Sequence, residues 1–515
     1  MTRGRPEVDV HFMIGFSGTR LPPETRDEIA AGSFAGATLF RFENVDCVEQ
    51  VRALTEDLQA ANRSRYPLLI AADQETGQLQ GLGAGTTAFP GAMALGATRD
   101  PDLARRVGRA IGRECLALGV NVNYAPVCDV ATRADNPSLG IRSFGDDPEL
   151  VAALATAMAS GMLDVGVVPV LKHFPGKGEA GVDPHYELPV LDLDIERLEK
   201  VELAPFRAAI RANAPAVMVG HYGLPAITGR RDLPASVSGE VVEGLLRRSM
   251  GFDGVVITDA LDMGAFAQAV GAEPAVVAAL RAGVDLLLCS ADGAARRRMM
   301  EAVAEGIRTI DSTVRTASRS RIDRLRQAVA TADRPGLDAV GCHDHVELAR
   351  EVASRSITAV RSAVLPLQPA AGDRILAVMP TPTNVTPADT SSTVSPTLAV
   401  ALRRHHHDVT EVIVSPDPSD AEIDSVVDVA GGHSHLVVGT IGATERQAAL
   451  VRRLIASGKP TVTAALRTPY DLHTYPMADT HLLTYSIHRF SMDALADVIF
   501  GLEVAAGSVP VAGIT

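Results

Sequence analysis

An aspartate and a histidine lie two residues apart in the sequence, at Asp183 and His185. They belong to residues 172–189, KHFPGKGEAGVDPHYELP, where glycines and prolines favour a loop over a helix or strand. A carboxylate beside an imidazole fixes the tautomer of the ring and favours its protonated form. Such a pair suits general acid–base catalysis near neutral pH, although an ordinary surface loop can carry the same two residues.

Four short apolar runs end in ionisable side chains. Asp73 follows LLIAA, Lys172 and His173 follow VVPVL, His221 follows AVMVG, and Asp259 follows GVVIT. If these runs are parallel strands of one barrel, their carboxyl ends lie on one rim and the side chains converge there. One charged residue at a strand end favours a structural ion pair, whereas four such ends on one rim favour a functional site.

The elements that must position these residues alternate along the first two thirds of the chain. Apolar runs such as VDVHFMIGF, PLLIAADQ and VNVNYAPV are separated by amphipathic stretches such as VEQVRALTEDLQAANR. About eight strand–helix units predict the α/β class and a closed (β/α)8 TIM-type barrel. An open doubly wound sheet is the alternative, but its G-x-G-x-x-G fingerprint after the first strand is absent.

Two domains are expected, because 515 residues exceed one ordinary hydrophobic core. Residues 1–335 are predicted to form the barrel, which ends in a basic helix, RTASRSRIDRLRQAVATADRPG, with arginines facing solvent. Residues 345–515 are predicted to form a smaller three-layer α/β sandwich. Within it, the Thr-, Ser- and Pro-rich stretch TPTNVTPADTSSTVSP (381–396) is expected to be a surface loop.

Composition limits the partners of the chain. A formal net charge of −14 weighs against nucleic acid, because phosphate binding needs clustered Lys and Arg. No run of about 18 apolar residues predicts a membrane span, and the N-terminus lacks a signal-peptide pattern. Five scattered cysteines without a C-x-x-C pattern favour a cytoplasmic location. A monomer and a dimer both stay open.

Several motifs, in order along the chain, resemble family-three glycoside hydrolases of the β-N-acetylglucosaminidase branch. KHFPGKGEAGVDPHYELP is similar to the family signature K-H-F-P-G-H-G-D-x-x-x-D-S-H-x-x-L-P, and GFDGVVITDALDMGA is similar to its nucleophile region. AADQETGQLQ, NPSLGIRSFG, MVGHYGLPA and AGVDLLL are further matches. LRTPYDL and YSIHRFSMDALADVIFG resemble, more loosely, the second domain of two-domain members.

The resemblance implies a retaining exo-β-N-acetylglucosaminidase (β-hexosaminidase) that uses no metal or organic cofactor. Its substrate would be a small amino-sugar glycoside, with cell-wall fragments as one source. Asp259 is the implied nucleophile and forms a covalent glycosyl ester, while His185, assisted by Asp183, is the implied acid/base. The residues expected to hydrogen-bond the hydroxyls of the terminal sugar are Asp73, Arg142, Lys172 and His173. His221 is expected near the sugar or in support of the site.

The sequence departs from the family pattern around these residues. Both arginines of D-Q-E-G-G-R-V-x-R are replaced, by Gln78 and Gly81, and the second of them usually helps to hold the sugar. The G-H-G-D segment reads GKGE, with Lys177 and Glu179, and the spacer of the Asp–His pair is Pro184, which stiffens the loop. With no Trp and 4% aromatic residues, sugar binding is expected to rely on hydrogen bonds.

Three alternative functions stay open. An imidazole acid/base does not repel an anion, so phosphate can replace water and give a β-N-acetylglucosaminide or β-glucoside phosphorylase; an inward-facing Lys177 would favour this. Another family-three enzyme such as a β-glucosidase usually takes its acid/base from the second domain and lacks the D-x-H loop. A non-catalytic sugar-binding relative fits the lost arginines, but not the presence of Asp259 and the Asp–His pair.

Overall fold

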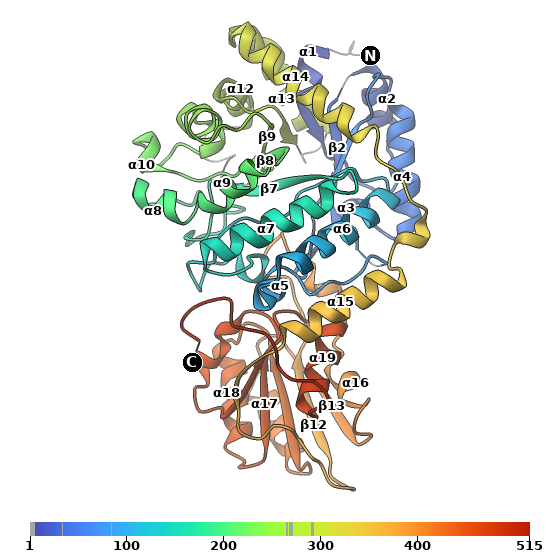
Figure 1. Cartoon of the computed structure of the whole chain (residues 1–515), viewed down its shortest axis with the longest axis vertical. Coiled ribbons are helices and arrows are strands. Elements are labelled where there is room, and N and C mark those ends of the chain that lie inside the picture. The colour runs from blue at the N-terminus through green and yellow to red at the C-terminus, as the bar shows by residue number, and fades with distance from the viewer. Residues whose placement is uncertain are drawn as a thin grey trace.

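The computed structural model describes residues 6–32, 34–83, 85–263, 266, 271–289 and 293–514. A barrel stands above a second α/β domain in the view of Figure 1. The barrel strands are β1 (Phe12–Ile14), β2 (Gly36–Leu39), β3 (Leu69–Ala72), β6 (Val122–Asn123), β7 (Val168–Phe174), β8 (Ala216–Val219), β9 (Val255–Thr258) and β10 (Leu287–Cys289). They are parallel, in the order β10-β1-β2-β3-β6-β7-β8-β9. A bridge between Ile257 and Leu286 joins the ends of this order, so the predicted barrel is confirmed.

Helices cover the outside of the barrel (Figure 1). Their bounds are α1 (Pro6–Asp9), α2 (Pro23–Ala31), α3 (Arg41–Asn44), α4 (Val48–Ala61), α5 (Ala92–Thr98), α6 (Pro101–Ala117), α7 (Pro148–Leu163), α8 (Ile195–Lys200), α9 (Ala204–Arg211), α10 (Pro225–Thr228), α12 (Ala272–Ala282), α13 (Gly293–Gly306) and α14 (Ser312–Val329). A π-helical segment, η3 (Glu240–Ser249), lies between α10 and β9. Two long helices begin at aspartate caps followed by proline, Asp100 for α6 and Asp147 for α7.

Alternating side chains along each strand separate the barrel interior from its outer layer. Ile70 and Ala72 pack outwards, whereas Leu69 and Ala71 pack inside with residues from other strands. Three apolar residues of α14 join this interior cluster. The expectation that the arginines of α14 face solvent is wrong for Arg321 and Arg326, which are buried. Arg321 pairs with Asp285. Cations are buried there because this face of α14 packs against the barrel.

The second domain is a three-layer α/β sandwich, as predicted. Its strands are β11 (Thr358–Ser362), β12 (Ile375–Pro380), β13 (Val409–Val414), β14 (His435–Thr440), β15 (Thr461–Ala465) and β16 (Thr480–Leu483). Their order is β11-β16-β15-β14-β12-β13, with only β11 antiparallel to its neighbour. The helices are α15 (His343–Ser356), α16 (Leu398–Leu402), α17 (Asp420–Ala430), α18 (Glu445–Ile455) and α19 (Arg489–Ile499). Alternate residues of β12 pack with α16 and α19 on one face and with α17 and α18 on the other.

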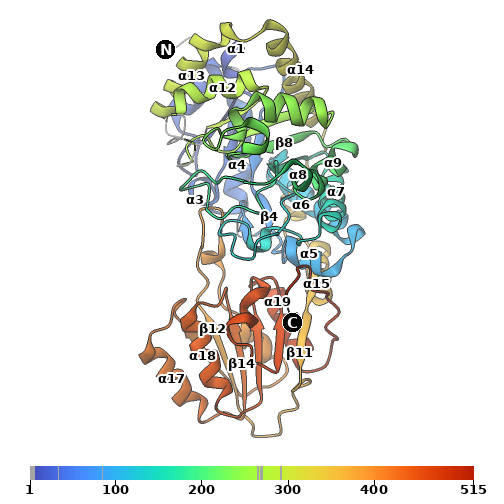
Figure 2. The same ribbon diagram turned by 90° about the vertical axis from the view of Figure 1, so that its left-hand side faces the viewer.

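The two parts of the chain share contacts. Leu348 and Val352 of α15 pack into the barrel core, while Ala353 of the same helix packs into the core of the second domain. The chain after β12 rises to the barrel beside α3 (Figure 2). The domain boundary between residues 335 and 345 stays a prediction. No helix in the described ranges is both long enough and apolar enough to cross a membrane.

Candidate active site

A cavity of about 580 Å³ opens at the carboxyl ends of the barrel strands. Tyr124, Met218 and Leu288, which belong to the barrel interior, line its base. Six of the eight residues that the sequence analysis selected line it, and a seventh, Asp183, contacts His185; the six are Asp73, Arg142, Lys172, His173, His185 and Asp259. Residues that end different strands, up to 186 positions apart in the chain from 73 to 259, therefore meet at one cavity, as their positions at strand ends predict.

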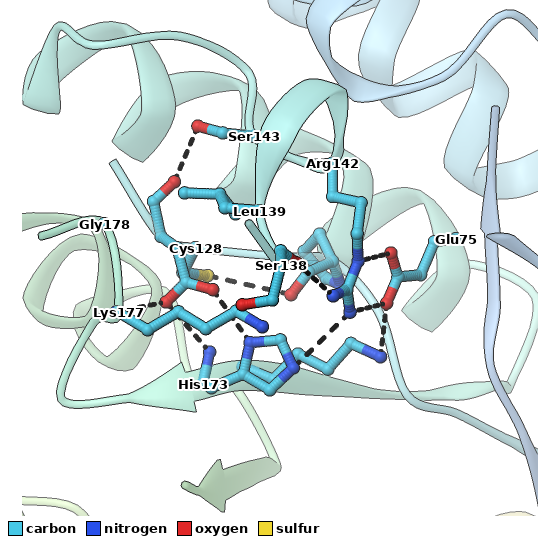
Figure 3. Close-up of polar contacts among 12 residues, drawn as sticks. Glu75, Cys128, Ser138, Leu139, Arg142, Ser143, His173, Lys177 and Gly178 are labelled. Atoms are coloured by element: carbon cyan, nitrogen blue, oxygen red, sulfur yellow. Dashed lines mark hydrogen bonds and ion pairs between the residues drawn. The ribbon is translucent and has the colours of Figure 1, made fainter. Parts of the chain in front are cut away.

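Lys172 is the centre of a buried ion cluster. Its Nζ lies 2.5 Å from Asp73 Oδ1 and 2.5 Å from Glu75 Oε1, and its side chain is 2% exposed. Arg142 donates to both oxygens of Glu75 at 2.8 Å, a bidentate pair (Figure 3). Burial alone would raise the pKa of Glu75, but Arg142 and Lys172 together hold it far below its usual range. Burial raises the pKa of Asp73, and Lys172 offsets part of that rise.

His173 is fixed by a carboxylate that the barrel buries completely. Its Nδ1–H donates to Asp129 Oδ2 at 2.8 Å, and Asp129 is 0% exposed. Burial lowers the pKa of His173 well below its ordinary value, and the positive charges of Lys177 and Arg142 lower it further. The other ring nitrogen, Nε2, lies 3.5 Å from the guanidinium of Arg142.

Asp183 and His185 form a hydrogen-bonded pair at the edge of the cavity. Asp183 Oδ1 accepts from the ring Nδ1–H of His185 at 2.6 Å and from the His185 backbone N–H at 3.0 Å. Burial would raise the pKa of Asp183, but the hydrogen bonds from His185 outweigh it and the pKa is lowered. Because Nδ1 is hydrogen-bonded to the carboxylate, the other ring nitrogen, Nε2, is the one that can exchange a proton with a molecule in the cavity.

Asp259 lies at the end of β9, on the wall of the same cavity. Its Oδ1 accepts the backbone N–H of Ala260 at 2.8 Å, so Oδ2 remains available. Burial would raise the pKa of Asp259, but the imidazoles of His173 and His221, the N–H of Ala260 and His185 lower it overall. A carboxylate that stays ionised, with an imidazole nearby, can act as a nucleophile.

His221, like Asp183, does not line the cavity. It is 0% exposed, its Nδ1 contacts Ser236 Oγ at 2.7 Å, and its Nε2 donates to the carbonyl of Ala260 at 3.1 Å. The ring also packs against Phe266, with centroids 4.3 Å apart. His221 thus holds the backbone next to Asp259, in line with the supporting role that the sequence left open, and its direct contact with a sugar stays a prediction.

The two positions where the family arginines are replaced lie on a hairpin, β4 (Gln74–Thr76) and β5 (Leu79–Gln80), that follows β3. Gly81 lines the cavity, and a Cβ built on it would lie 2.5 Å from the carbonyl oxygen of Asp73. The backbone therefore leaves no room for a side chain at this position. Gln78 is buried, and its carbonyl accepts from Thr390 of the second domain.

Lys177 faces inward, as the phosphate alternative requires. Its side chain is buried and lines the cavity, and its ammonium forms no hydrogen bond or ion pair with the described residues. Burial and the charge of Arg142 lower the pKa of Lys177 to about 8, while Asp129 and Asp259 act in the opposite direction. Among the described residues, no group of three His, Cys, Asp or Glu side chains is placed to hold a metal ion.

Sequence reasoning assigned no role to Glu75 and Asp129, which contact residues of the cavity wall, or to two aromatic residues at its mouth. Glu75 follows the same apolar run as Asp73, and Asp129 follows the run VNVNYAPVC, so the strand-end rule applies to both. Aromatic residues at the mouth, Phe42 and Tyr186, carry no such signal. The expectation of a surface loop at 381–396 holds for much of the segment, but Thr386 and residues 389–391 are buried, and Thr390 contacts the barrel hairpin.

The sequence is similar to those of known glycoside hydrolases. The family model described as glycosyl hydrolase family 3 N terminal domain matches residues 8–325. The chain is 31% identical to the beta-hexosaminidase A of Pseudoalteromonas piscicida, over 96% of this chain and 91% of that protein. It is 39% identical to a beta-hexosaminidase of Alkalilimnicola ehrlichii, over 54% of this chain and 80% of that one.

A solved structure supports the same grouping over the whole chain. A glycoside hydrolase family 3 beta-N-acetylglucosaminidase from a Paenibacillus species superposes with a TM-score of 0.93 at 34% identity, and 99% of each chain is covered. The barrel and the second domain are thus shared with this relative. The chain belongs to glycosyl hydrolase family 3 and is a glycoside hydrolase.

Proposed function

We propose that the protein is a retaining exo-β-N-acetylglucosaminidase in which Asp259 is the nucleophile and His185, assisted by Asp183, is the acid/base. The observation that carries the proposal is the pair itself: Asp183 engages Nδ1 of His185 at 2.6 Å, and the ring lines the same cavity as Asp259. The amino-sugar preference is supported by the relatives, whose names are beta-hexosaminidase and beta-N-acetylglucosaminidase.

The buried end of the cavity suits one terminal sugar. Its polar wall carries Asp73, Lys172 and His173, whose oxygens and nitrogens can hydrogen-bond sugar hydroxyls. The base is closed by side chains of the barrel interior, so the substrate enters from one side only. An enclosed end with one entrance favours exo cleavage, in which the terminal sugar is buried and the leaving group points outwards.

Two displacements then follow at the anomeric carbon. In the first, Nε2–H of protonated His185 donates its proton to the glycosidic oxygen, Asp259 Oδ2 attacks the anomeric carbon, and the bond to the leaving group breaks. In the second, neutral His185 accepts a proton from water, and the water oxygen displaces the Asp259 carboxylate. Two inversions retain the configuration of the sugar.

Initial rates on aryl β-glycosides that differ only in the sugar test the proposal. We expect the N-acetylglucosaminide to be hydrolysed fastest, with the β-anomer as first product by NMR. Asp259→Asn should reduce kcat at least a thousandfold, while His343→Ala, at an exposed histidine remote from the cavity, should leave it unchanged. A preference for glucoside, or an α-anomer as first product, would contradict the proposal. Sugar binding without turnover would favour the non-catalytic alternative.

Phosphorolysis is the second candidate function, and Lys177 favours it. A buried ammonium without a partner among the described residues lines the cavity, and it can bind an anionic acceptor. Phosphate oxygen would then replace water at the anomeric carbon, release Asp259 and give a sugar 1-phosphate. Product analysis at high phosphate decides between the two. A sugar 1-phosphate that disappears in Lys177→Met would support phosphorolysis, and free sugar alone would exclude it.

A further inference from the structure

A segment of the second domain forms part of the cavity wall. Residues 386–390, here named the rim segment, follow β12 and reach the barrel, and Pro387, Ala388 and Thr390 line the cavity. In Figure 2 this part of the chain rises from the second domain towards α3. The family-model match ends at residue 325, so the rim segment lies outside the part of the chain that defines the family.

The barrel holds the rim segment at its last residue. The backbone N–H of Thr390 donates to the Gln78 carbonyl at 2.9 Å, and the Thr390 hydroxyl donates to the same carbonyl at 3.1 Å. The hydroxyl also accepts the backbone N–H of Gln80 at 3.1 Å. These contacts join the rim segment to the hairpin that carries the two replaced family arginines.

The second domain holds the same segment from the other side. Asp389, which is fully buried, forms an ion pair with the buried Arg467. Its two oxygens also accept the backbone N–H groups of Val385 and Ser391, at 2.9 and 2.8 Å. A segment fixed from both domains keeps its shape, so Pro387 and Ala388 form a preformed wall and not a loose flap.

The mouth of the cavity combines this wall with two exposed aromatic rings. Phe42 of α3 is 60% exposed and Tyr186 is 66% exposed, yet both line the cavity. The buried end, in contrast, is lined by charged side chains such as Lys172, which is 2% exposed. The expectation that sugar binding relies on hydrogen bonds thus fits the buried end but not the mouth, where apolar surface is available for a ring face.

The position of His185 indicates which part of the substrate meets the mouth. The general acid must lie beside the glycosidic oxygen, and Tyr186 is the next residue in the chain. With the terminal sugar in the buried end, the leaving group extends past His185 to the mouth. We propose that the rim segment, Phe42 and Tyr186 form a leaving-group subsite that binds a pyranose ring by its apolar face. This inference rests on the proposed function.

Two substrates with the same terminal sugar test the subsite: methyl β-N-acetylglucosaminide and the β-1,4-linked disaccharide of N-acetylglucosamine. Both leaving groups are alcohols that need protonation, so the ratio of their kcat/KM values reports contacts with the second ring. We expect Tyr186→Ala and Phe42→Ala each to lower the disaccharide-to-methyl ratio about tenfold, which corresponds to about 1.4 kcal/mol. Ala388→Trp, which fills the mouth from the second domain, should lower it at least as much.

Val385→Ala is the matched control, because this side chain belongs to the same stretch, is exposed and does not line the cavity. Its ratio should equal that of the wild type. Retained turnover of the methyl glycoside shows that each variant is folded. Unchanged ratios in the three mouth variants would overturn the subsite while leaving the proposed function intact. A wild-type enzyme that cleaves neither substrate would refute the proposed function and the subsite with it.

Discussion

Replacing Asp183 by asparagine keeps the size of the side chain and removes the charge that His185 contacts. Asp183 Oδ1 accepts two N–H groups of His185, from the ring at 2.6 Å and from the backbone at 3.0 Å. An asparagine oxygen can still accept from the backbone. The ring contact, however, becomes a bond between neutral groups, and an imidazolium formed during catalysis loses its counter-charge.

The magnitude follows from the kind of bond that is lost. A hydrogen bond with one charged partner contributes about 1.5–3 kcal/mol, and a neutral bond contributes about 0.5–1.5 kcal/mol. The difference, about 1–1.5 kcal/mol, lowers a rate roughly tenfold when protonated His185 is needed in the transition state. We therefore expect Asp183→Asn to lower kcat/KM about tenfold for methyl β-N-acetylglucosaminide.

An activated aryl glycoside provides the internal control. Its leaving group needs little protonation, and kcat/KM reports only the steps up to formation of the glycosyl enzyme. In Asp183→Asn, kcat/KM for this substrate should stay within about twofold of the wild type, while kcat falls because His185 must still activate water. Equal losses of kcat/KM on both substrates, or no loss on the methyl glycoside, would refute the assignment of this pair as the acid/base.

Three further variants test the site through stability and packing. The pKa of Lys177 is lowered from 10.5 to about 8, so Lys177→Met should stabilise the protein by about 3 kcal/mol at pH 7 in urea unfolding, a gain that shrinks as pH rises from 8 to 10.5. Gly81→Ala places a Cβ 2.5 Å from the Asp73 carbonyl oxygen and should lower kcat/KM at least tenfold, whereas Gly239→Ala, in open space, should not change it. Glu75→Gln leaves the buried Arg142 without its counter-charge and Lys172 with Asp73 alone, and it should lower the free energy of unfolding by about 3 kcal/mol; an unchanged urea midpoint would contradict this.

Periodicity and strand ends predicted most of the barrel and much of its active site. Alternation of apolar runs and helices placed eight strands in order, and the residues that end four of them meet at the cavity or beside it. The rule states which residues lie at the rim but not where each side chain points. His221 is an example: it follows a strand end, but its ring is buried away from the cavity and contacts Ser236 and Ala260.

The part of the cavity wall that the second domain contributes could not be predicted from the sequence. Thr390 contacts Gln78 across 312 positions of the chain, and no local pattern encodes such a contact. Composition predicts a loop for residues 381–396, which agrees with its backbone. Which of its side chains are buried depends on contacts with distant parts of the chain. Asp389 likewise has the sequence of an exposed turn residue, but it is buried and pairs with Arg467.

The most direct test of the mechanism is to trap the covalent intermediate in His185→Ala with an activated aryl β-N-acetylglucosaminide. The first step needs little acid with this leaving group, but the second step lacks its base, so the glycosyl enzyme should accumulate. Intact mass should then rise by one N-acetylhexosaminyl unit, and peptide mapping should place it on Asp259. An unmodified protein at steady turnover, or a sugar attached to a different residue, would contradict the account.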